Sequence, residues 1–555
     1  MWVCGFHTAT HVATLTERAS NSELPKPTKY HHFSAMAAVP TPAVNHQSNE
    51  SEKVGARVVL ALAGAKLLLH LLSSGRFGIF RDEMYVIACA RHLDWGYVDH
   101  PPGGILIGWI AYHIFGHWLP GLRLLPTLAG AGLVIFTAKV VREMGGRSVA
   151  QVLAALAVCV VPIYQLFDSW LTMNAFEPLI WLGCFYCVLR AVNTGSGRTW
   201  LGFGVLAGIG FETKYSVLFL VAGVLIGLLL TPQRRFLADG RLWIGLLVCA
   251  AIALPNFLWQ LHHGFPFVEM RQNLATGHRD VVRGPGAFLL DQMMIMGPLT
   301  APLWIGGTVW LLVGRERARY GAFGWAFLFV LGSFIALKGK NYYVTPCYPV
   351  VFAAGAVAFE AVTGARNRQW LRVAYPASMA VTGLALLPIA VPILAPDSYI
   401  RYVKWIHVTP SASENQNNGP LPQYFADEFG WADMVREVAR VYQALPLADR
   451  NQAVIFSNGW GEAAAIDFFG PTYGLPRAIC PHDSYWLWGP GDCNGKVVIV
   501  LRTDGRGDRK AFATVEKAGS VSNPYSRRDE WFDIYVCRGL KFNLREAWPG
   551  LKRFN

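Results

Sequence analysis

The central part of the chain alternates apolar segments of roughly 18–22 residues with short polar joints, and an α-helix of that length crosses a lipid bilayer. Only 15% of the 555 residues are charged and 53% are hydrophobic, whereas soluble domains carry about 25% charged residues. We therefore predict a mainly α-helical membrane protein with about eleven transmembrane helices. The fifth and sixth segments are short, and the predicted spans are 54–74, 121–141, 148–166, 175–192, 199–213, 215–231, 242–260, 298–314, 321–337, 346–363 and 372–395.

Arginine is concentrated in every second joint between these segments. The arginines are Arg142, Arg147, Arg190, Arg198, Arg234, Arg235, Arg241, Arg315, Arg317, Arg319, Arg366, Arg368 and Arg372. Because cytoplasmic joints of membrane proteins are enriched in Lys and Arg, this pattern predicts a multi-pass plasma (inner) membrane protein with a cytoplasmic N-terminus and residues after 395 on the exoplasmic side. The same topology explains the net charge of +13 better than a nucleic-acid partner does.

The chain divides into three predicted parts: an N-terminal extension, a transmembrane domain and a C-terminal domain. Residues 1–50 are polar and without period, and we predict either a disordered extension or upstream sequence from a wrong start. Residues 51–395 form the predicted transmembrane domain. In residues 396–555, strand-like runs at 453–457 and 496–501 and a helical pattern at 427–445 predict an exoplasmic α/β domain.

The ten cysteines are scattered without the spacing of a zinc or iron–sulfur site, and nothing in the sequence calls for a metal. Two of Cys480, Cys493 and Cys537 would be able to form a disulfide in an oxidising compartment. The predicted outer joints instead contain acids, lysines and tyrosines, and the longest of them, 75–120, includes a predicted interfacial helix at 103–116.

Four motifs in these outer joints occur in a particular order. They are Arg81-Asp82-Glu83-Met84-Tyr85, Trp95-Gly96-Tyr97-Val98-Asp99-His100-Pro101-Pro102, Thr213-Lys214, and Lys338-Gly339-Lys340-Asn341-Tyr342-Tyr343 with Tyr348-Pro349. This order resembles bacterial glycosyltransferases of the family 39 type, relatives of the dolichyl-phosphate-mannose protein mannosyltransferases and the aminoarabinose lipid A transferases. The resemblance covers about residues 55–400. It implies a GT-C fold and transfer of a sugar from a polyprenyl-phosphate carrier at the exoplasmic face, with inversion in a single displacement.

Asp82 is the predicted general base, because an acceptor hydroxyl attacks the anomeric carbon only as a nearby base takes its proton. The alternative is a loop acid that pairs with Arg81 or caps a helix. Glu83 is the second predicted catalytic residue and either orients Asp82 or an acceptor group, or lies in solvent. Tyr85 is assigned to the sugar or acceptor.

The leaving phosphate develops negative charge and needs cationic partners. We predict His100, Lys214, Lys338, Lys340 and Tyr343 for this role. His100 stands where relatives usually have a basic residue, and it is fully charged only below a pKa near 6.5. The alternative for Lys214 is an ion pair with Glu212, and the alternative for the Lys338–Tyr343 cluster is an interfacial anchor.

Asn174 occupies the position at which several relatives carry a second acid. Glu177 lies one helical turn further along the same face. Either Asn174 binds the sugar or acceptor and Glu177 supplies the charge, or the second acid is dispensable. Asp168 is a competing candidate.

The donor is expected to be a polyprenyl-phosphate-linked sugar with no further cofactor. The acceptor is a glycan, lipid or protein hydroxyl, and membrane lipids but no nucleic acid are the other partners. A transporter or flippase of a lipid-linked sugar is the competing hypothesis, and it requires ionisable residues within the spans and repeated halves. Lys66, His70 and Glu360 are isolated ionisable residues there, and no repeat is visible. A catalytically inactive scaffold is the third possibility.

Overall fold

The computed structural model describes residues 46–277, 281–408, 414, 419–503 and 506–555. The prediction for residues 1–45 lies outside the described part of the chain. Residues 46–50, predicted as the end of that extension, form the first turn of a long helix, α1 (His46–Ser73).

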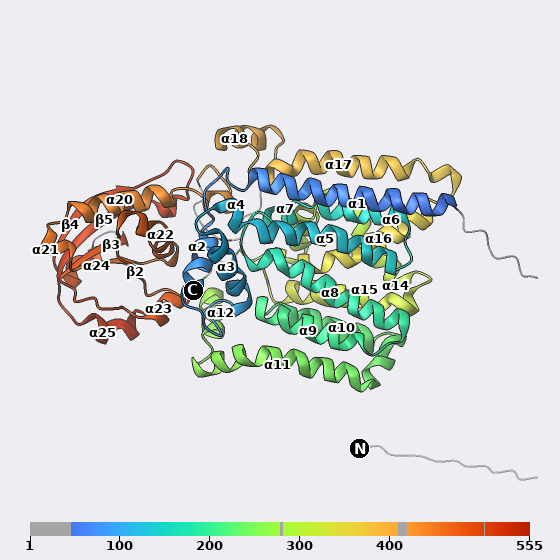
Figure 1. The fold of residues 1–555 in the computed structure, drawn as a ribbon, viewed down its shortest axis with the longest axis horizontal. Coiled ribbons are helices and arrows are strands. Elements are labelled where there is room, and N and C mark those ends of the chain that lie inside the picture. Colours follow the sequence, from blue (N-terminus) through green and yellow to red (C-terminus); the bar gives the residue numbers. More distant parts are fainter. Residues whose placement is uncertain (1–45, 278–280, 409–413, 415–418, 504–505) are drawn as a thin grey trace, which may run out of the picture. The chain divides into compact units, whose positions relative to one another are not determined.

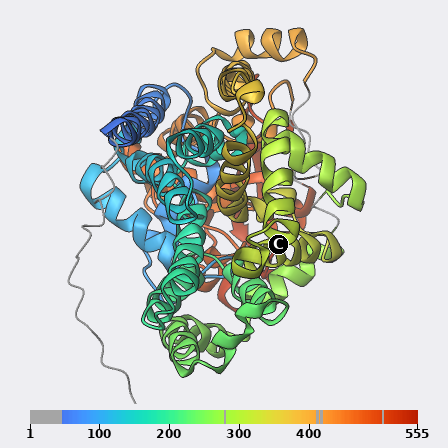
Figure 2. The ribbon, with the colours of Figure 1, turned by 90° about the vertical axis from the view of Figure 1, so that its right-hand side faces the viewer.

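Each of the eleven predicted spans contains a helix, and the helix of the span predicted at 148–166 ends at Val160, before the extended Val161. These helices lie side by side (Figure 1), and Figure 2 views most of them nearly end on. They are α1, α5 (Leu124–Glu143), α6 (Ser148–Val160), α8 (Met173–Thr194), α9 (Thr199–Thr213), α10 (Val217–Leu229), α11 (Gly240–His262), α14 (Ala301–Val313), α15 (Arg317–Ala336), α16 (Tyr348–Val362) and α17 (Leu371–Ala390).

Length and composition support fewer spans than eleven. Within the described residues, seven helices are long and apolar enough to cross a membrane, or up to nine if each of two bent pairs counts as one span. The short α6 and α9 and the bent segments at η1 (Pro232–Ala238) and η2 (Pro298–Thr300) account for the difference. The predicted number of eleven therefore stays a prediction.

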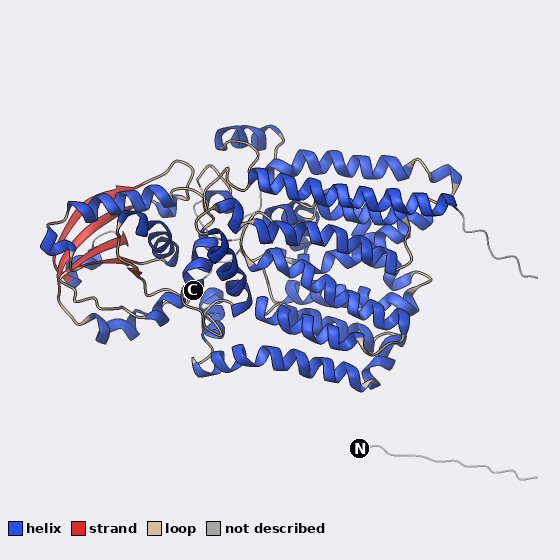
Figure 3. Cartoon of the chain, viewed as in Figure 1, coloured by secondary structure: helices blue, strands red, loops and turns tan. Residues whose placement is uncertain are grey.

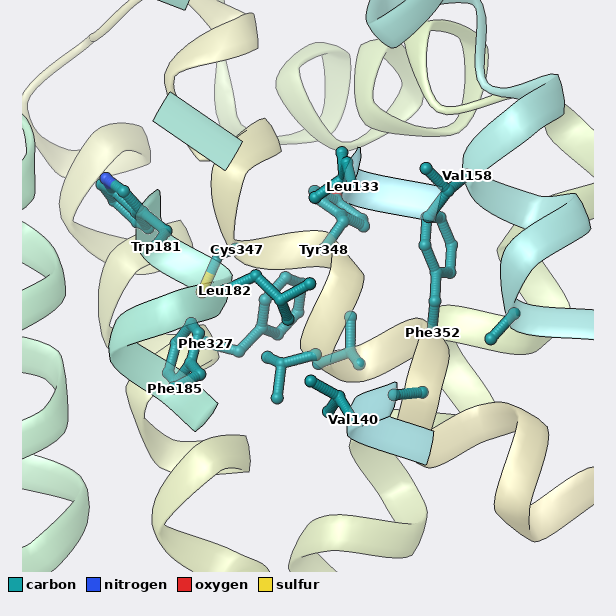
Figure 4. Close-up of a cluster of buried hydrophobic side chains, with 14 of the residues drawn as sticks. Leu133, Val140, Val158, Trp181, Leu182, Phe185, Phe327, Cys347, Tyr348 and Phe352 are labelled. Carbon is teal, nitrogen blue, oxygen red and sulfur yellow. The ribbon is translucent and has the colours of Figure 1, made fainter. Parts of the chain in front are cut away.

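The helices pack closely through aromatic side chains and small residues. Figure 4 shows one part of this core, in which Phe185 of α8, Phe327 of α15 and Tyr348 of α16 lie together. A side chain at Gly204 of α9 would place its Cβ 1.9 Å from the Gly245 carbonyl oxygen of α11. Glycine at both positions therefore allows these two backbones to touch.

Several short helices lie at one end of the long ones. They are α2 (Arg81–Ala90), α3 (Pro102–Phe115), α4 (Leu119–Leu122), α7 (Pro162–Phe167), α12 (Pro266–Thr276) and α13 (Pro285–Ile295). Helix α3 is the helix predicted at 103–116, and α2 and α3 lie beside the C-terminal elements (Figure 1).

The C-terminal part contains all the strands of the described chain (Figure 3). The sheet order is β2-β1-β3-β5-β4, with β1 parallel to β2 and β3, and β5 antiparallel to β3 and β4. The strands are β1 (Ala453–Ser457), β2 (Ala478–Ile479), β3 (Val497–Thr503), β4 (Phe512–Val521) and β5 (Phe532–Leu540), and the flanking helices include α20 (Trp431–Ala444), α22 (Trp460–Phe469) and α23 (Ser484–Trp488).

The mainly helical fold class with a C-terminal α/β part is confirmed. The strands expected at 453–457 and 496–501 are β1 and β3, and α20 lies within the helix expected at 427–445. A boundary after residue 395 stays a prediction, because helix α2 and the C-terminal helices α20 and α22 share one hydrophobic cluster. Cys480, Cys493 and Cys537 are each free thiols, so the disulfide considered from the sequence is not formed.

Candidate active site

A cavity of about 440 Å³ is lined by four helices, α2, α7, α13 and α17, and by residues around the start of η3 (Asn341–Cys347). Residues between Val408 and Asp427, from the beginning of the C-terminal part, also contribute to its wall. Its wall combines apolar side chains, which come largely from α7, α13 and α17, with polar ones. The polar lining consists of Arg81, Asp82, Thr172, Asn174, Asp291, Lys340, Asn341, Tyr342, Glu414, Gln423, Tyr424 and Asp427.

Asp82 faces this cavity from the first turn of α2. The helix begins after Phe80, whose backbone is extended, and the Glu83 carboxylate accepts a hydrogen bond from the Phe80 backbone N–H at 2.9 Å. This local bond fixes the helix start and thereby the direction of the side chain between them. The Asp82 side chain is 47% exposed because it faces the cavity, and its nearest cation is Arg81, at 3.7 Å from Nε to Oδ1.

The surroundings raise the pKa of Asp82 from 3.8 to about 6. Burial is the main cause, because the protein around the cavity removes water that would stabilise the charged form. Arg81 acts in the opposite direction, whereas the carboxylates of Asp427, Glu414 and Asp99 raise the pKa further. Asp82 is thus mostly ionised at pH 7 but can accept a proton nearer neutrality than an ordinary aspartate.

Glu83 is buried away from the cavity and is held by a dense set of partners. Its carboxylate accepts hydrogen bonds from the Arg123 side chain, at 2.6 Å for the shortest, and from the Leu171 backbone N–H at 2.9 Å. Arg123 also donates to Glu428 at 3.3 Å and to the Ser74 carbonyl at 2.7 Å. The solvated alternative for Glu83 is therefore wrong, and its geometry is that of a residue that positions Asp82.

The other carboxylates on the cavity wall each have a cationic partner. Glu414 accepts from Lys340 at 3.1 Å, and Asp427 lies 2.8 Å from Arg527. Asp291 pairs with Arg283 and accepts a hydrogen bond from Asn341 at 2.9 Å. Lys340, predicted for phosphate binding, does line the cavity.

Lys214 connects Asn174 and Glu177, the two residues considered above in connection with a second acid. Its Nζ donates to Asn174 at 2.9 Å and to Glu177 at 2.8 Å, and it lies over the Tyr343 ring at 4.7 Å. The alternative of an ion pair with Glu212 is wrong, because the Glu212 carboxylate makes no hydrogen bond to any described residue. Asn174 lines the cavity while Glu177 and Lys214 lie behind it, so this pair orients the Asn174 amide.

His100 and Tyr85 lie together outside the cavity. His100 is buried between the rings of Tyr85 and Tyr97, and its Nε2 is 3.5 Å from Asp99. The Tyr85 hydroxyl donates to Asp99 at 3.1 Å and accepts from the Ser484 backbone N–H at 3.2 Å. Tyr85 thus joins the first loop to the C-terminal part, and the assigned roles of both residues stay predictions.

The remaining predicted residues lie around the turn before η3. Lys338 is exposed and has a positive φ of 53°, while the Tyr343 ring packs against Phe334 and Tyr342. Of the ten residues predicted for the site, three line the cavity: Asp82, Asn174 and Lys340. Among the described residues no group of three or more His, Cys, Asp or Glu is placed to hold a metal ion.

Sequence reasoning missed several residues that build the site. Arg123 and the buried Glu428 complete the network around Glu83, and the Trp170 indole donates to Glu428 at 3.1 Å. Asp427 contributes both a side chain to the cavity and a backbone carbonyl that accepts from the Arg81 N–H at 3.1 Å. The polar Asp427-Glu428 pair at the start of the predicted C-terminal helix was the available signal.

The fold and the site together define a multi-helix membrane protein with a polar cavity at one end of its helices. The family described as dolichyl-phosphate-mannose-protein mannosyltransferase matches residues 99–259. The chain is 28% identical over 283 residues to the lipid A galacturonosyltransferase RgtD of Rhizobium johnstonii. That match covers 48% of this chain and 58% of the relative, so it spans little more than half of that protein.

The solved structures of ArnT from Cupriavidus metallidurans have a similar fold. The apo structure has a TM-score of 0.55 and the structure bound to undecaprenyl phosphate a TM-score of 0.56. Each is 14% identical to this chain and covers 86% of it and 97% of ArnT. The fold implied by the motif resemblance is confirmed, since the chain has the fold of ArnT, and the family match supports the resemblance over part of the chain.

Proposed function

We propose that the protein is an integral membrane glycosyltransferase that moves a sugar from a polyprenyl-phosphate carrier to a hydroxyl acceptor. The observation that carries this proposal is the position of Asp82, a carboxylate with a raised pKa in the wall of a cavity that is lined by both polar and apolar side chains. The apolar residues of α7, α13 and α17 suit the first isoprene units of a carrier, and the polar residues suit a sugar and a phosphate.

In the proposed reaction the acceptor oxygen attacks the anomeric carbon while its proton passes to the Asp82 carboxylate. The bond from the anomeric carbon to the phosphate oxygen breaks, and polyprenyl phosphate leaves with the electron pair. A single displacement of this kind inverts the anomeric centre. Positive charge near the leaving oxygen lowers the barrier, and Lys340 is the lysine on the cavity wall that is suited to this role.

The residues around Asp82 have positioning roles in this proposal. Glu83 fixes the start of α2, and the Lys214–Glu177 pair orients the Asn174 amide toward the cavity. Asn174 then binds a sugar or acceptor hydroxyl, as its side chain has both a donor and an acceptor.

The reaction takes place on the exoplasmic face if the arginine-rich joints are cytoplasmic. Antiparallel helices place these joints together, as the contacts of Glu143 with Arg190 and of Glu360 with the Arg147 N–H illustrate.

The sugar and the acceptor follow from the relatives only as classes. RgtD is a lipid A galacturonosyltransferase, and a lipid-anchored glycan is the first acceptor to examine for this chain. A panel of polyprenyl-phosphate donors that includes hexoses, pentoses and uronic acids covers the sugars to be tested.

The test is sugar transfer by the purified full chain in lipid nanodiscs, with cell-envelope lipids as acceptors. We expect Asp82→Asn to reduce turnover by about 10²- to 10⁴-fold, as for loss of a general base. Asp94→Asn is the matched control, because Asp94 is an exposed acid of the same loop that contacts the Trp95 N–H, a bond the amide can keep. Equal activity of the Asp82 variant and the wild type contradicts the assigned base. Movement of a lipid-linked sugar across the bilayer without transfer instead supports a flippase.

A further inference from the structure

Arg81 is a buried cation with unused hydrogen-bond donors. The residue is 8% exposed and lines the cavity beside Asp82. Its side chain makes no hydrogen bond to any described residue, and its Nε is buried without a partner there. The one ion contact, to Asp82 at 3.7 Å, is too long for a hydrogen bond. A buried guanidinium whose hydrogen-bond donors lack acceptors is costly, so this arrangement indicates a ligand that completes it.

The C-terminal part of the chain holds Arg81 in place. The guanidinium lies over the Trp460 ring at 4.5 Å from the ring centroid. A Cβ at Gly461 would lie 2.9 Å from Cδ of Arg81 and 3.1 Å from its Cγ. Glycine therefore allows the arginine stem to lie against the start of α22 while the ring supports the charged head. A planar guanidinium stacked in this way keeps its edge available for a bidentate oxyanion.

Among the described residues of the cavity wall, Arg81 is a cation that no carboxylate holds by a hydrogen bond. Glu414, Asp291 and Asp427 are each paired with a cation other than Arg81. Asp82 is needed as the base, and its Oδ1 lies 3.7 Å from Nε of Arg81. The two terminal nitrogens of Arg81 have no protein acceptor among the residues described.

We propose that Arg81 binds an oxyanion of the donor substrate and that Trp460 and Gly461 of α22 position it for this task. The proposal rests on the proposed function, because it concerns the donor of that reaction. Two groups share the required chemistry: the phosphate of the carrier and a carboxylate on the transferred sugar, as in a uronic acid. Both match the planar fork of a guanidinium.

Binding measurements separate these two sources without requiring turnover. The full chain in nanodiscs is titrated with undecaprenyl phosphate, with an undecaprenyl-phosphate hexose and with an undecaprenyl-phosphate hexuronate. Arg81→Gln is compared with the wild type and with Arg436→Gln, which removes an exposed arginine paired with Asp433 on α20. We expect Arg81→Gln to weaken binding by about 10- to 100-fold, the value of a hydrogen-bonded charged contact.

The pattern over the three lipids identifies the group. Weaker binding of all three assigns Arg81 to the phosphate, whereas weaker binding of the hexuronate alone assigns it to the sugar carboxylate. Unchanged binding of all three, with the wild type binding normally, overturns the Arg81 inference and leaves the proposed function intact. Failure of the wild type to bind any of them contradicts the proposed function itself.

Two further variants keep the test decisive if Arg81→Gln does not fold. Arg81→Lys retains the charge but loses the fork, and Gly461→Ala retains Arg81 but displaces its stem. Alanine is otherwise favourable in a helix, so α22 itself is not expected to suffer. We expect both variants to weaken binding of the same lipids by about 3- to 30-fold. Wild-type affinity in both folded variants refutes the positioning by α22.

Discussion

The carboxylate of Glu83 accepts a 2.6 Å hydrogen bond from Arg123, while the preceding residue, Asp82, faces the cavity. The two neighbouring acids therefore have different tasks: one is buried and paired, and the other is available to a substrate. Glu83→Ala leaves the Arg123 guanidinium buried with only Glu428 as an ionic partner, and loss of one member of a buried ion pair costs about 3–5 kcal/mol. We expect a large drop in the thermal unfolding midpoint, measured in detergent by intrinsic fluorescence.

Glu428 is the matched control for that variant. It shares Arg123 with Glu83, and burial raises the pKa of Glu428 from 4.5 to about 7. The folded protein thus binds a proton that the unfolded chain releases at lower pH. The stabilising contribution of this proton is present below about pH 4.5 and is lost as the pH rises through 7. Glu428→Gln is expected to remove this pH dependence and to cost little stability at pH 8. A drop as large as that of Glu83→Ala at pH 8 contradicts the shared-charge account.

The pH dependence of transfer tests Asp82 directly. Because the pKa of Asp82 is about 6 in the free protein, kcat/KM is expected to fall tenfold for each unit below about pH 6. Arg81 lowers the pKa of Asp82, so Arg81→Gln should move this limb to higher pH. The measurement is a pH profile of kcat/KM between pH 5 and 8 with the wild type, Arg81→Gln and the Asp94→Asn control. An acid limb that stays in place when Arg81 is removed argues that another group titrates.

Substitutions of Asn174 and Lys214 are expected to differ in their effects on activity and stability. Lys214→Met removes the ammonium that joins Asn174 and Glu177, at 2.9 and 2.8 Å. Asn174→Ala removes only the amide that lines the cavity. We expect Asn174→Ala to lower kcat/KM by about tenfold with little change in stability, since one polar contact is worth about 1–1.5 kcal/mol. Lys214→Met should lower both activity and the unfolding midpoint, because it leaves the buried Glu177 with Ser216 as its remaining partner.

Activity and unfolding are measured on the same preparations of these variants. Thr199→Ala is a suitable control, since among the described residues its hydroxyl bonds only to the Ser196 backbone carbonyl, in the joint between α8 and α9. Full activity of Asn174→Ala removes Asn174 from the substrate contacts and leaves it a partner of Lys214.

The helices and the order of the site motifs were predictable, and the partners of the site residues were not. Hydrophobic length locates each helix because every span must bury its own backbone polar groups. Lys214 was expected to contact the carrier phosphate, with Glu212, two residues away in sequence, as the alternative partner, yet it pairs with Glu177 of another helix. Likewise, Arg123 lies 305 residues from Glu428. Such partners depend on tertiary packing, which a local pattern does not contain.

Lys66 and His70, in the first predicted span, also have partners that the sequence did not predict. Lys66 and His70 were considered isolated, but Lys66 lies 2.9 Å from Asp168, and His70 bonds Gln165 at 2.7 Å. The two charged side chains are only 1% and 4% exposed. Gly130 allows the Asp168 carboxylate to pack against α5, since a Cβ there would lie 2.1 Å from Oδ2. A closed pair of this kind is a structural contact rather than a step on a transport path.

The Lys66–Asp168 pair gives a prediction that tests whether it is purely structural. Lys66→Met leaves Asp168 buried without its cation, and we expect a loss of about 3–5 kcal/mol. The double variant Lys66→Met, Asp168→Leu removes both charges and should regain most of that stability, because well-packed apolar residues often replace a buried ion pair without cost. The readouts are the unfolding midpoint and sugar transfer by each folded variant. Recovery of both in the double variant is expected for a structural pair. Restored stability without sugar transfer instead assigns the pair a role in that activity beyond stability.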